Sequence, residues 1–202
     1  MTSLETGIAL FPWKGHAQSG DRHVVISSEE DGILLAAIDG IGHGDGAASA
    51  AKIASSVLES RPKRSVVDLV QDCHDALRHT RGVVMSLASV SPQLGSMTWL
   101  GVGNVQAGVQ RAGSPRGTIQ EVLLLRGGVI GSELLPALHP ATLPFCAGDT
   151  LVFATDGIHG DFFSELSPLE SPQKCADRIL RLHCRGNDDA LVLVARHPAR
   201  QI

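Results

Sequence analysis

The stretch of residues 32–54 constrains the fold most, because an apolar run ends on a single carboxylate and continues through a glycine-rich turn into a helical pattern. Residues 32–38 are almost continuously apolar, which is typical of a strand buried on both faces, and Asp39 stands at the end of this strand. Glycines alternate through the turn that follows, so the backbone there can approach a ligand closely. The sequence therefore predicts a buried strand and a helix with Asp39 at their junction.

Further acidic residues stand at the ends of other predicted strands. Asp21 directly precedes one such strand, and Asp156 follows another. Asp188 and Asp189 together precede the last strand. Any one of these positions alone is most often only a turn, but the repetition favours one site at which the carboxylates converge. Several negative charges in a partly dry site are tolerable only when cations lie between them.

The residue types in this set indicate which cations fit. All-oxygen ligands favour magnesium or manganese, and the sequence contains neither an H-E-x-x-H motif nor a Cys/His cluster that would indicate zinc. Two such ions, about 3.5–4 Å apart and bridged by one carboxylate, would activate a water for in-line attack on a phosphoryl group. Asp39 is the natural bridging residue in this arrangement.

Two other residues near these carboxylates are candidates for substrate binding. His43 in the glycine turn would position a phosphate or protonate a leaving group, although a histidine in such a turn is as often an ordinary polar loop residue. Arg22 would hold a phosphate with its guanidinium fork, but a solvated surface arginine is an equal alternative. Both readings stay open at this point.

A dinucleotide site is the main rival for the glycine turn, because residues 42–47 satisfy a loose G-x-G-x-x-A fingerprint between a strand and a helix. Asp39 counts against it, since a negative charge would stand at the start of a loop that should receive a pyrophosphate. The segment after the helix also reads as another helix instead of a second parallel strand. We therefore favour the metal site.

The remaining pattern predicts the other elements. Ser65 caps a second helix that Gly82 ends, an antiparallel meander begins at Val83, and short β-like runs follow. The remaining expected segments are a strand over 7–13, a hairpin turn over 29–32, a loop over 134–144, a strand over 150–155, helices over 158–166 and 171–183, and a last strand over 190–195.

Length and composition exclude several classes of protein. The 202 residues fit a single domain, which we expect to span residues 1–196 with a loose tail over 197–202. The net charge of −4 offers no basic footprint for nucleic acid, and no stretch approaches the roughly 20 apolar residues of a membrane span. The N-terminus also lacks a basic region, so we expect a cytoplasmic protein. The four cysteines lack a C-x-x-C pair, so we expect reduced thiols.

Four blocks of the sequence resemble, in order, the SpoIIE branch of the metal-dependent type-2C (PPM) serine/threonine phosphatases. The blocks are 19–21 (SGD), 38–44 (IDGIGHG), 153–158 (FATDGI) and 187–191 (NDDAL), and residues 100–105 (LGVGNV) with 144–148 extend the match. Each block alone is weak, whereas the ordered set is specific. Most members of that branch attach the phosphatase domain to sensor or membrane domains. Because we expect a single domain here, the chain is most similar to the stand-alone RsbX-like phosphatases of the stressosome.

This resemblance implies an α+β fold, with a central β-sandwich of two antiparallel sheets flanked by helices on both sides and a metal centre at one end. It implies two Mn²⁺ or Mg²⁺ ions. Asp39 would bridge them, the Gly40 carbonyl would bind one ion, and Asp156 and Asp188 would complete the other. Asp21 would hold water at the second ion. Asp39 and Asp156 are then the expected catalytic carboxylates.

The sequence departs from type-2C enzymes at two places. Eukaryotic members have a histidine directly after the Asp-Gly pair, whereas His43 stands three residues beyond Gly40, so a general-acid role does not transfer to it. Eukaryotic members also have an acidic residue four positions after the equivalent of Asp156, whereas this chain has Gly160 there. Only the neighbouring Asp161 would substitute for that acid at a third metal site. Of the adjacent pair, Asp188 is the expected ligand, because many type-2C enzymes have asparagine at the position of Asp189.

The resemblance implies a protein phosphatase that hydrolyses phosphoserine or phosphothreonine by direct attack of a metal-bound hydroxide. The expected substrate is a phosphorylated STAS-domain protein in bacterial stress-response signalling, and the expected state is a monomer without nucleic-acid or membrane partners. The alternative is a catalytically silent phosphatase fold that acts as a binding or adaptor protein in the same pathway. The complete set of carboxylates favours the enzyme.

Overall fold

The computed structural model describes residues 4–13, 18–28, 32–115 and 121–199 of the chain. The strands are β1 (Glu5–Phe11), β2 (Asp21–Ser28), β3 (Gly32–Gly40), β4 (Val83–Ser91), β5 (Ser96–Val102), β6 (Gln106–Gln110), β7 (Glu121–Val122), β8 (Ala141–Pro144), β9 (Thr150–Ala154) and β10 (Ala190–Arg196). The helices are α1 (Asp45–Ser60), α2 (Val66–Leu77), α3 (Pro172–His183) and a short 3-10 helix, η1 (Phe162–Glu165).

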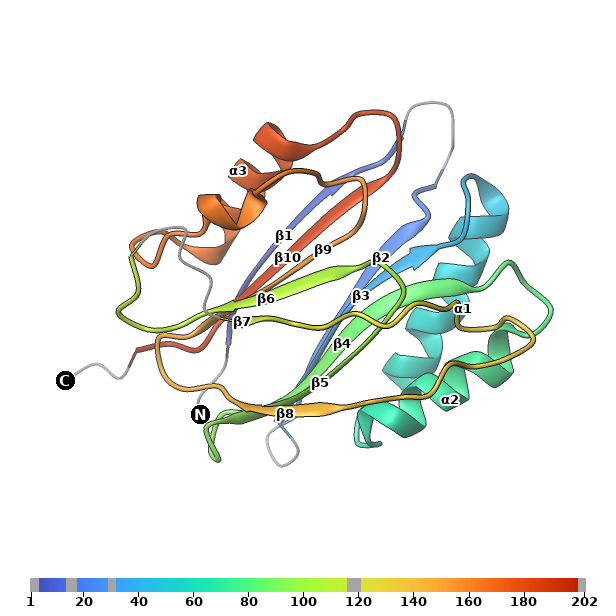
Figure 1. Ribbon diagram of the computed structural model, residues 1–202, viewed down its shortest axis with the longest axis horizontal. Helices are drawn as coiled ribbons and strands as arrows, with labels where there is room; N and C mark the ends of the chain where they lie inside the picture. Colours follow the sequence, from blue (N-terminus) through green and yellow to red (C-terminus); the bar gives the residue numbers. More distant parts are fainter. Residues whose placement is uncertain (1–3, 14–17, 29–31, 116–120, 200–202) are drawn as a thin grey trace.

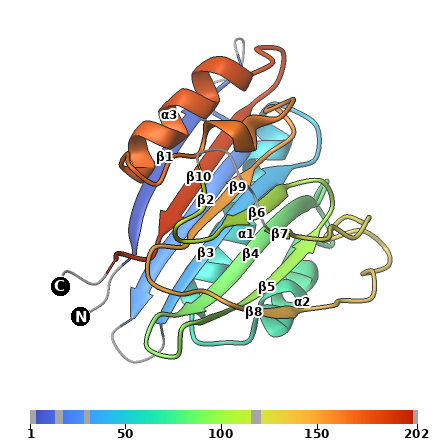
Figure 2. The ribbon, with the colours of Figure 1, turned by 60° about the vertical axis from the view of Figure 1, so that its left-hand side comes forward.

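The strands form two five-stranded antiparallel sheets that pack face to face (Figure 1). One sheet has the order β1-β10-β9-β6-β7, which we call the first sheet, and the second sheet has the order β2-β3-β4-β5-β8. Figures 1 and 2 show α1 and α2 on the outer face of the second sheet and α3 on the outer face of the first. This arrangement confirms the expected sandwich flanked by helices on both sides.

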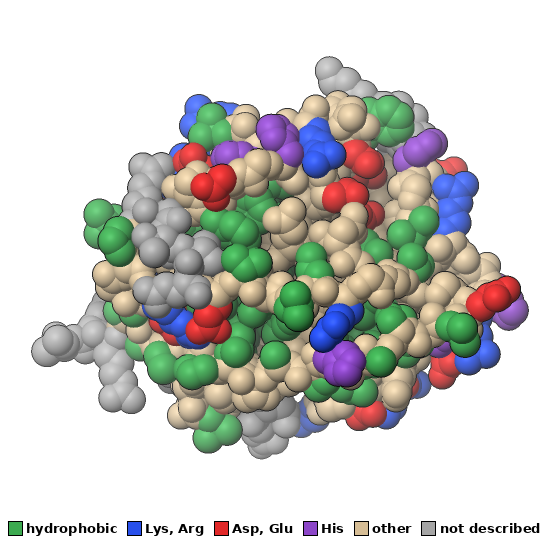
Figure 3. Space-filling model, viewed as in Figure 1, with side chains coloured by type: hydrophobic (Ala, Val, Ile, Leu, Met, Phe, Trp, Pro, Cys, Tyr) green, Lys and Arg blue, Asp and Glu red, His purple; other side chains and the backbone are tan. Residues whose placement is uncertain are grey.

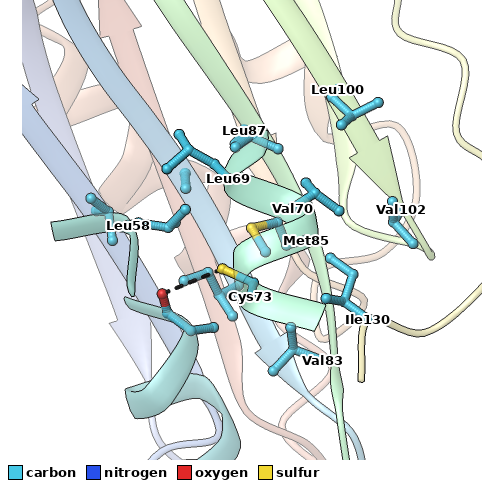
Figure 4. Close-up of a cluster of buried hydrophobic side chains, with 14 of the residues drawn as sticks. Leu58, Leu69, Val70, Cys73, Val83, Met85, Leu87, Leu100, Val102 and Ile130 are labelled. Carbon is cyan, nitrogen blue, oxygen red and sulfur yellow. Dashed lines mark hydrogen bonds between the residues drawn. The ribbon is translucent and has the colours of Figure 1, made fainter. Parts of the chain in front are cut away.

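Three buried clusters correspond to the three interfaces between these layers. One lies between the sheets, one between α3 and the first sheet, and one between α1, α2 and the second sheet. In the last cluster, Met85 and Leu87 of β4 pack against Leu69 and Val70 of α2 (Figure 4). Because α1 faces the sheet with alanines at 47, 50, 51 and 54, its backbone lies close to β3.

The buried thiol in this cluster confirms part of the cysteine prediction. All four cysteines are free, and Cys73 and Cys175 are buried. The Cys73 thiol donates to the carbonyl oxygen of Ala54 on α1 over 3.7 Å (Figure 4). Burial raises the pKa of this thiol to about 12, so it stays protonated and joins the two helices without reactivity.

The buried strand 32–39 and its helix lie where the sequence places them. β3 lies in the interior of the second sheet, between β2 and β4, and its residues 33–38 are buried. α1 begins at Asp45, and the cap of α2 is as predicted, because the Ser65 hydroxyl accepts from the backbone N–H of Asp68. The predicted end of α2 at Gly82 is wrong, because the helix already ends at Leu77. An irregular turn that includes Thr80 connects Leu77 to Gly82.

The predicted meander after Val83 is wrong in its connectivity. β4 and β5 form a hairpin, but β6 pairs with β9 and β7 in the other sheet. Gly103 marks the crossing, with a φ of +95° and an added Cβ only 2.1 Å from Cγ1 of Val84. An alternating pattern predicts a strand but does not say which sheet it joins, and so it missed this crossing.

Two other expectations are also corrected. The loop predicted over 134–144 contains β8, which pairs with β5 at the edge of the second sheet and ends on Pro144, where a missing N–H costs no ladder bond. The helix predicted over 158–166 contains only η1.

Most of the turn predicted over 29–32 lies outside the described residues, as do residues 200–202 of the predicted tail. His197, in the same predicted tail, is buried and exchanges backbone hydrogen bonds with Asp149 and Gly148.

Candidate metal centre

Strand ends from both sheets bring the predicted carboxylates to one end of the sandwich. In the second sheet, Asp21 at the start of β2 is directly opposite Asp39 near the end of β3. In the first sheet, Asp156 follows β9 and Asp188 precedes β10, and these two strands are neighbours. The predicted carboxylates therefore stand at the ends of neighbouring strands, one pair of strands in each sheet.

A cavity of about 150 Å³ lies between these strand ends. Its lining residues are Asp39, Ile41, Gly42, His43, Val84, Asn104, Asp156 and Asp188. In the space-filling view, acidic side chains gather in a hollow in the upper right of the molecule (Figure 3). Three of the predicted ligands thus share one small cavity with His43.

The electrostatics of these carboxyls are those of a crowded acidic site. The pKa of Asp39 is raised to about 9. Burial is the largest cause, and the negative charges of Asp21, Asp156 and other nearby carboxylates contribute to the same shift. Burial likewise raises the pKa of Asp21 to about 8 against a hydrogen bond from Thr155, which lowers it. Such groups gain strongly from a cation that compensates their charge.

The donor set fits hard divalent cations in its chemistry. Carboxylate oxygens are the acidic donors of the cavity, and oxygen donors are those that magnesium and manganese prefer. Within the described parts of the chain, no three His, Cys, Asp or Glu side chains are placed closely enough to hold one ion as they stand.

Asp21 is placed differently from the other three. It does not line the cavity but a groove on the other side of β2, and only 4% of its surface is exposed. Its carboxylate accepts a 2.7 Å hydrogen bond from the hydroxyl of Thr155, which in turn accepts from the backbone N–H of Leu191. Asp21 thus joins the second sheet to the first beside the cavity.

The adjacent pair Asp188 and Asp189 divides into two roles. Both carboxylate oxygens of Asp189 accept backbone hydrogen bonds of 2.8 Å, one from Trp13 and the other from Gly20. Asp188 instead lines the cavity, and one of its oxygens accepts from the N–H of Asp189. This division supports Asp188 as the ligand and gives Asp189 the task of fixing the segment before β2.

Asn104 is a site residue that the sequence analysis did not single out. Its side-chain amide donates to the Asp156 carboxylate over 2.8 Å, and it lines the same cavity. The available signal was its place in the block 100–105 of the family resemblance, at the crossing between the sheets. Because its donor occupies one oxygen of Asp156, Asn104 orients that carboxylate.

Gly40 is held by its surroundings on both sides. Its N–H donates to the carbonyl oxygen of Gly20, and an added Cβ would lie 2.2 Å from the carbonyl oxygen of Ala47. This close approach of β3 to the first turn of α1 explains why glycine follows Asp39. A glycine is thus required here by packing, in addition to the metal-binding carbonyl that the resemblance leads us to expect at Gly40.

The predicted substrate-binding residues separate. The ring of His43 lies edge-on to Trp13 at a centroid distance of 5.5 Å, and its carbonyl oxygen accepts from the guanidinium of Arg81. Arg22 does not line the cavity, because it belongs to the groove that contains Asp21. Asp161, the proposed substitute at a third site, is exposed and is not a lining residue of the cavity.

Comparison with known proteins identifies one family. The stage II sporulation protein E (SpoIIE) family model matches residues 29–198. No curated protein matches the chain significantly.

Solved structures with the same fold cover nearly the whole chain. A structure reported under a title on the bacterial stressosome as a modular system adapted to control secondary messenger signaling is 31% identical over 96% of this chain and 100% of its own, with a TM-score of 0.84. RsbX in complex with magnesium is 18% identical over 96% of this chain and 94% of its own, with a TM-score of 0.83. The phosphatase-domain structure of SpoIIE from Bacillus subtilis is 19% identical, with a TM-score of 0.79, over 100% of this chain and 65% of its own.

The helices of the described residues are short. The longest has 16 residues, and no helix among the described residues is long and apolar enough to cross a membrane.

Proposed function

The chain belongs to the SpoIIE branch of the metal-dependent type-2C (PPM) phosphatases, and we propose that it hydrolyses phosphoserine or phosphothreonine on a signalling protein. The observation that carries this proposal is the cavity that Asp39, Asp156 and Asp188 share. Two strand ends of one sheet and one strand end of the other supply these carboxylates, and their crowding favours cations.

Asp39, Asp156 and Asp188 would hold two Mn²⁺ or Mg²⁺ ions, with the Gly40 carbonyl as a further ligand and Asp21 fixing water at the second ion. When bound, such ions lower the pKa of water and screen the negative charge of a phosphoryl group. The magnesium found with RsbX supports this choice of ions.

The side chains of this protein perform the remaining tasks. Asp39 would give up its proton when the site is filled, because a cation offsets the burial and the repulsion that together raise its pKa. Asn104 keeps the Asp156 carboxylate in one orientation by donating to it. His43, which lines the cavity, would orient the phosphoryl group through its ring.

Water is the proposed acceptor of the phosphoryl group. No serine, threonine or cysteine is among the described residues that line the cavity. A covalent phosphoenzyme on such a residue is therefore not part of the mechanism, and the attack is direct.

We propose a phosphorylated STAS-domain protein of the stressosome as substrate, and the cytoplasm as the place of action of a monomeric enzyme. The 31% identity to a stressosome structure and the likeness to RsbX support this assignment. Failure to dephosphorylate purified STAS phosphoproteins, with unrelated phosphopeptides cleaved efficiently, would contradict it.

Hydrolysis of p-nitrophenyl phosphate tests the activity itself. We expect turnover with manganese, none with excess chelator, and losses of at least about 100-fold in Asp39→Asn and Asp156→Asn variants. Activity that survives chelation would refute the mechanism. The alternative, a silent adaptor, predicts no tight binding of two ions in a calorimetric titration of the wild-type protein.

A further inference from the structure

A groove of about 630 Å³ lies at the open edge of the sandwich, beside the candidate metal centre but separate from it. β1 and β2 are edge strands of the two sheets, and α1 packs beside β2. The lining residues are Leu10, Gln18, Ser19, Asp21, Arg22, His23 and Lys52. None of them lines the cavity of Asp39.

Two cations, Arg22 and Lys52, line this groove. Among the described residues, neither Arg22 on β2 nor Lys52 on α1 forms an ion pair, although the chain as a whole carries a net charge of −4. The Nε atom of Arg22 is buried and has no hydrogen-bond partner. A buried donor without an acceptor is costly, so a ligand that brings an acceptor to this guanidinium would be favoured.

The other groove residues fit an anionic chain. His23 lines the groove beside Arg22 and adds a ring that can form hydrogen bonds. Leu10 is 42% exposed at the β1 side of the groove and offers apolar contact. The Asp21 carboxyl is buried and bound to Thr155, so little of its charge faces the groove.

The groove starts one strand away from the metal centre. Asp21 belongs to the groove, and its direct partner across the β2–β3 ladder, Asp39, belongs to the cavity. Opposed residues of an antiparallel pair have Cβ atoms about 4.5–5.5 Å apart, which is less than the span of two residues of extended chain. A peptide with its phosphorylated residue at the cavity therefore reaches the groove with neighbouring residues.

Building on the proposed function, we infer that this groove binds an acidic segment next to the phosphorylated residue of the protein substrate. Carboxylates of that segment pair with Arg22 and Lys52, and an apolar side chain packs on Leu10. Two cations on different elements and an apolar contact suit an extended peptide better than a single free anion. The groove thus selects the substrate, while the cavity performs the reaction.

Kinetics on matched phosphopeptides test this inference. One phosphoserine peptide carries glutamates on both sides of the phosphoserine, and its partner carries glutamines. We expect wild-type protein with manganese to favour the acidic peptide by roughly three- to tenfold in kcat/KM, as two surface charge pairs allow, and less at high salt. Lys52→Gln and Arg22→Gln should each reduce this ratio, and Lys52→Glu should invert it.

Lys174→Gln is the matched control, since Lys174 is exposed on α3, on the outer face of the other sheet. This variant should keep the wild-type ratio. Fluorescence anisotropy with an unphosphorylated, labelled glutamate peptide in chelator supplies a second readout, in which the Lys52→Glu variant should bind more weakly than the Lys174→Gln variant.

The outcomes separate the groove from the proposed activity. A wild-type protein that hydrolyses both peptides equally, or a Lys52→Glu variant that keeps the full ratio, would overturn the groove and leave the phosphatase intact. A protein that hydrolyses nothing, but binds the acidic peptide through Lys52, would overturn the phosphatase and leave the groove. Equal losses on both peptides in the Arg22 and Lys52 variants would make these residues structural and refute the inference.

Discussion

Asp21 and Asp39 lie directly opposite each other on paired strands, and both carboxyls have a pKa far above the ordinary value of 3.8. Two carboxylates so placed repel each other, and burial adds to the cost of their charge. The folded protein without metal therefore retains protons that the unfolded chain releases. The stability of the protein should therefore fall as pH rises and increase when metal binds.

Without metal, stability should fall as pH rises. Well below pH 3.8 both carboxyls are protonated in the folded and in the unfolded state. Between pH 4 and about 9 the folded state binds more protons than the unfolded state, so the free energy of unfolding decreases, by at most about 1.4 kcal/mol per pH unit for each retained proton. Thermal melts in chelator at pH 6 and 8.5 should show a lower Tm at the higher pH.

Asp39→Asn should reduce this slope, and the exposed Asp75→Asn should leave it unchanged. Added manganese should raise the Tm more at pH 8.5 than at pH 6, because protons and cations compete for the same oxygens. A metal-free Tm that rises steadily from pH 6 to pH 8.5 would contradict the assignment of raised pKa values.

Exchange of the adjacent acids should separate metal binding from folding. In Asp189→Asn, the new amide would point a donor at one of the backbone N–H groups of Trp13 and Gly20, so unfolding should become easier by about 1–3 kcal/mol. Asp188→Asn should leave the unfolding free energy nearly unchanged but weaken metal binding. Denaturant unfolding in chelator and metal titration by calorimetry measure the two effects, and the reverse pattern would exchange the roles.

Asn104→Ala should act through Asp156. Without the 2.8 Å amide donor, that carboxylate loses its fixed orientation, and loss of such a supporting partner typically costs about 10–100-fold in metal affinity. Metal titration of the apo protein is the measurement. Asn104→Gln, which keeps the amide on a longer side chain, should lose less, and equal affinities in wild type and the alanine variant would dismiss this role.

Gly40→Ala should destabilise the fold. The added Cβ would meet the carbonyl oxygen of Ala47 at 2.2 Å, so β3 and α1 must separate at a cost of about 2 kcal/mol or more. Gly127→Ala is the control, because its Cβ meets no atom within 4 Å. Chemical denaturation should leave the Gly127 variant within about 0.5 kcal/mol of wild type; a similar small effect for Gly40 would show that the contact relaxes cheaply.

Much of the site was predictable because its residues are marked locally. An apolar run that stops at an acidic residue and a glycine is visible in sequence, and Asp39 and Asp156 both have this mark. What the sequence could not supply is distance across the fold. The bonds from Trp13 and Gly20 to Asp189 join residues far apart in the chain, so the distinction from Asp188 rested on the family resemblance alone.

The fold shows the same division between local and distant information. The α2 cap at Ser65 was predictable because its partner is three residues away. The crossing at Gly103 and the edge position of β8 were not, because each depends on which sheet a short strand joins. Prolines near Pro144 indicated a loop on local grounds, whereas an edge strand tolerates them.

The carboxylates of the candidate centre belong to two different sheets, and neither sheet alone contains the set. An ion held among them would therefore cross-link the two layers, as a disulfide cross-links two segments, but reversibly and at a strength set by the free metal concentration. Metal occupancy then reports the assembly of the whole sandwich, since a folding intermediate that has formed only one sheet contains no complete site.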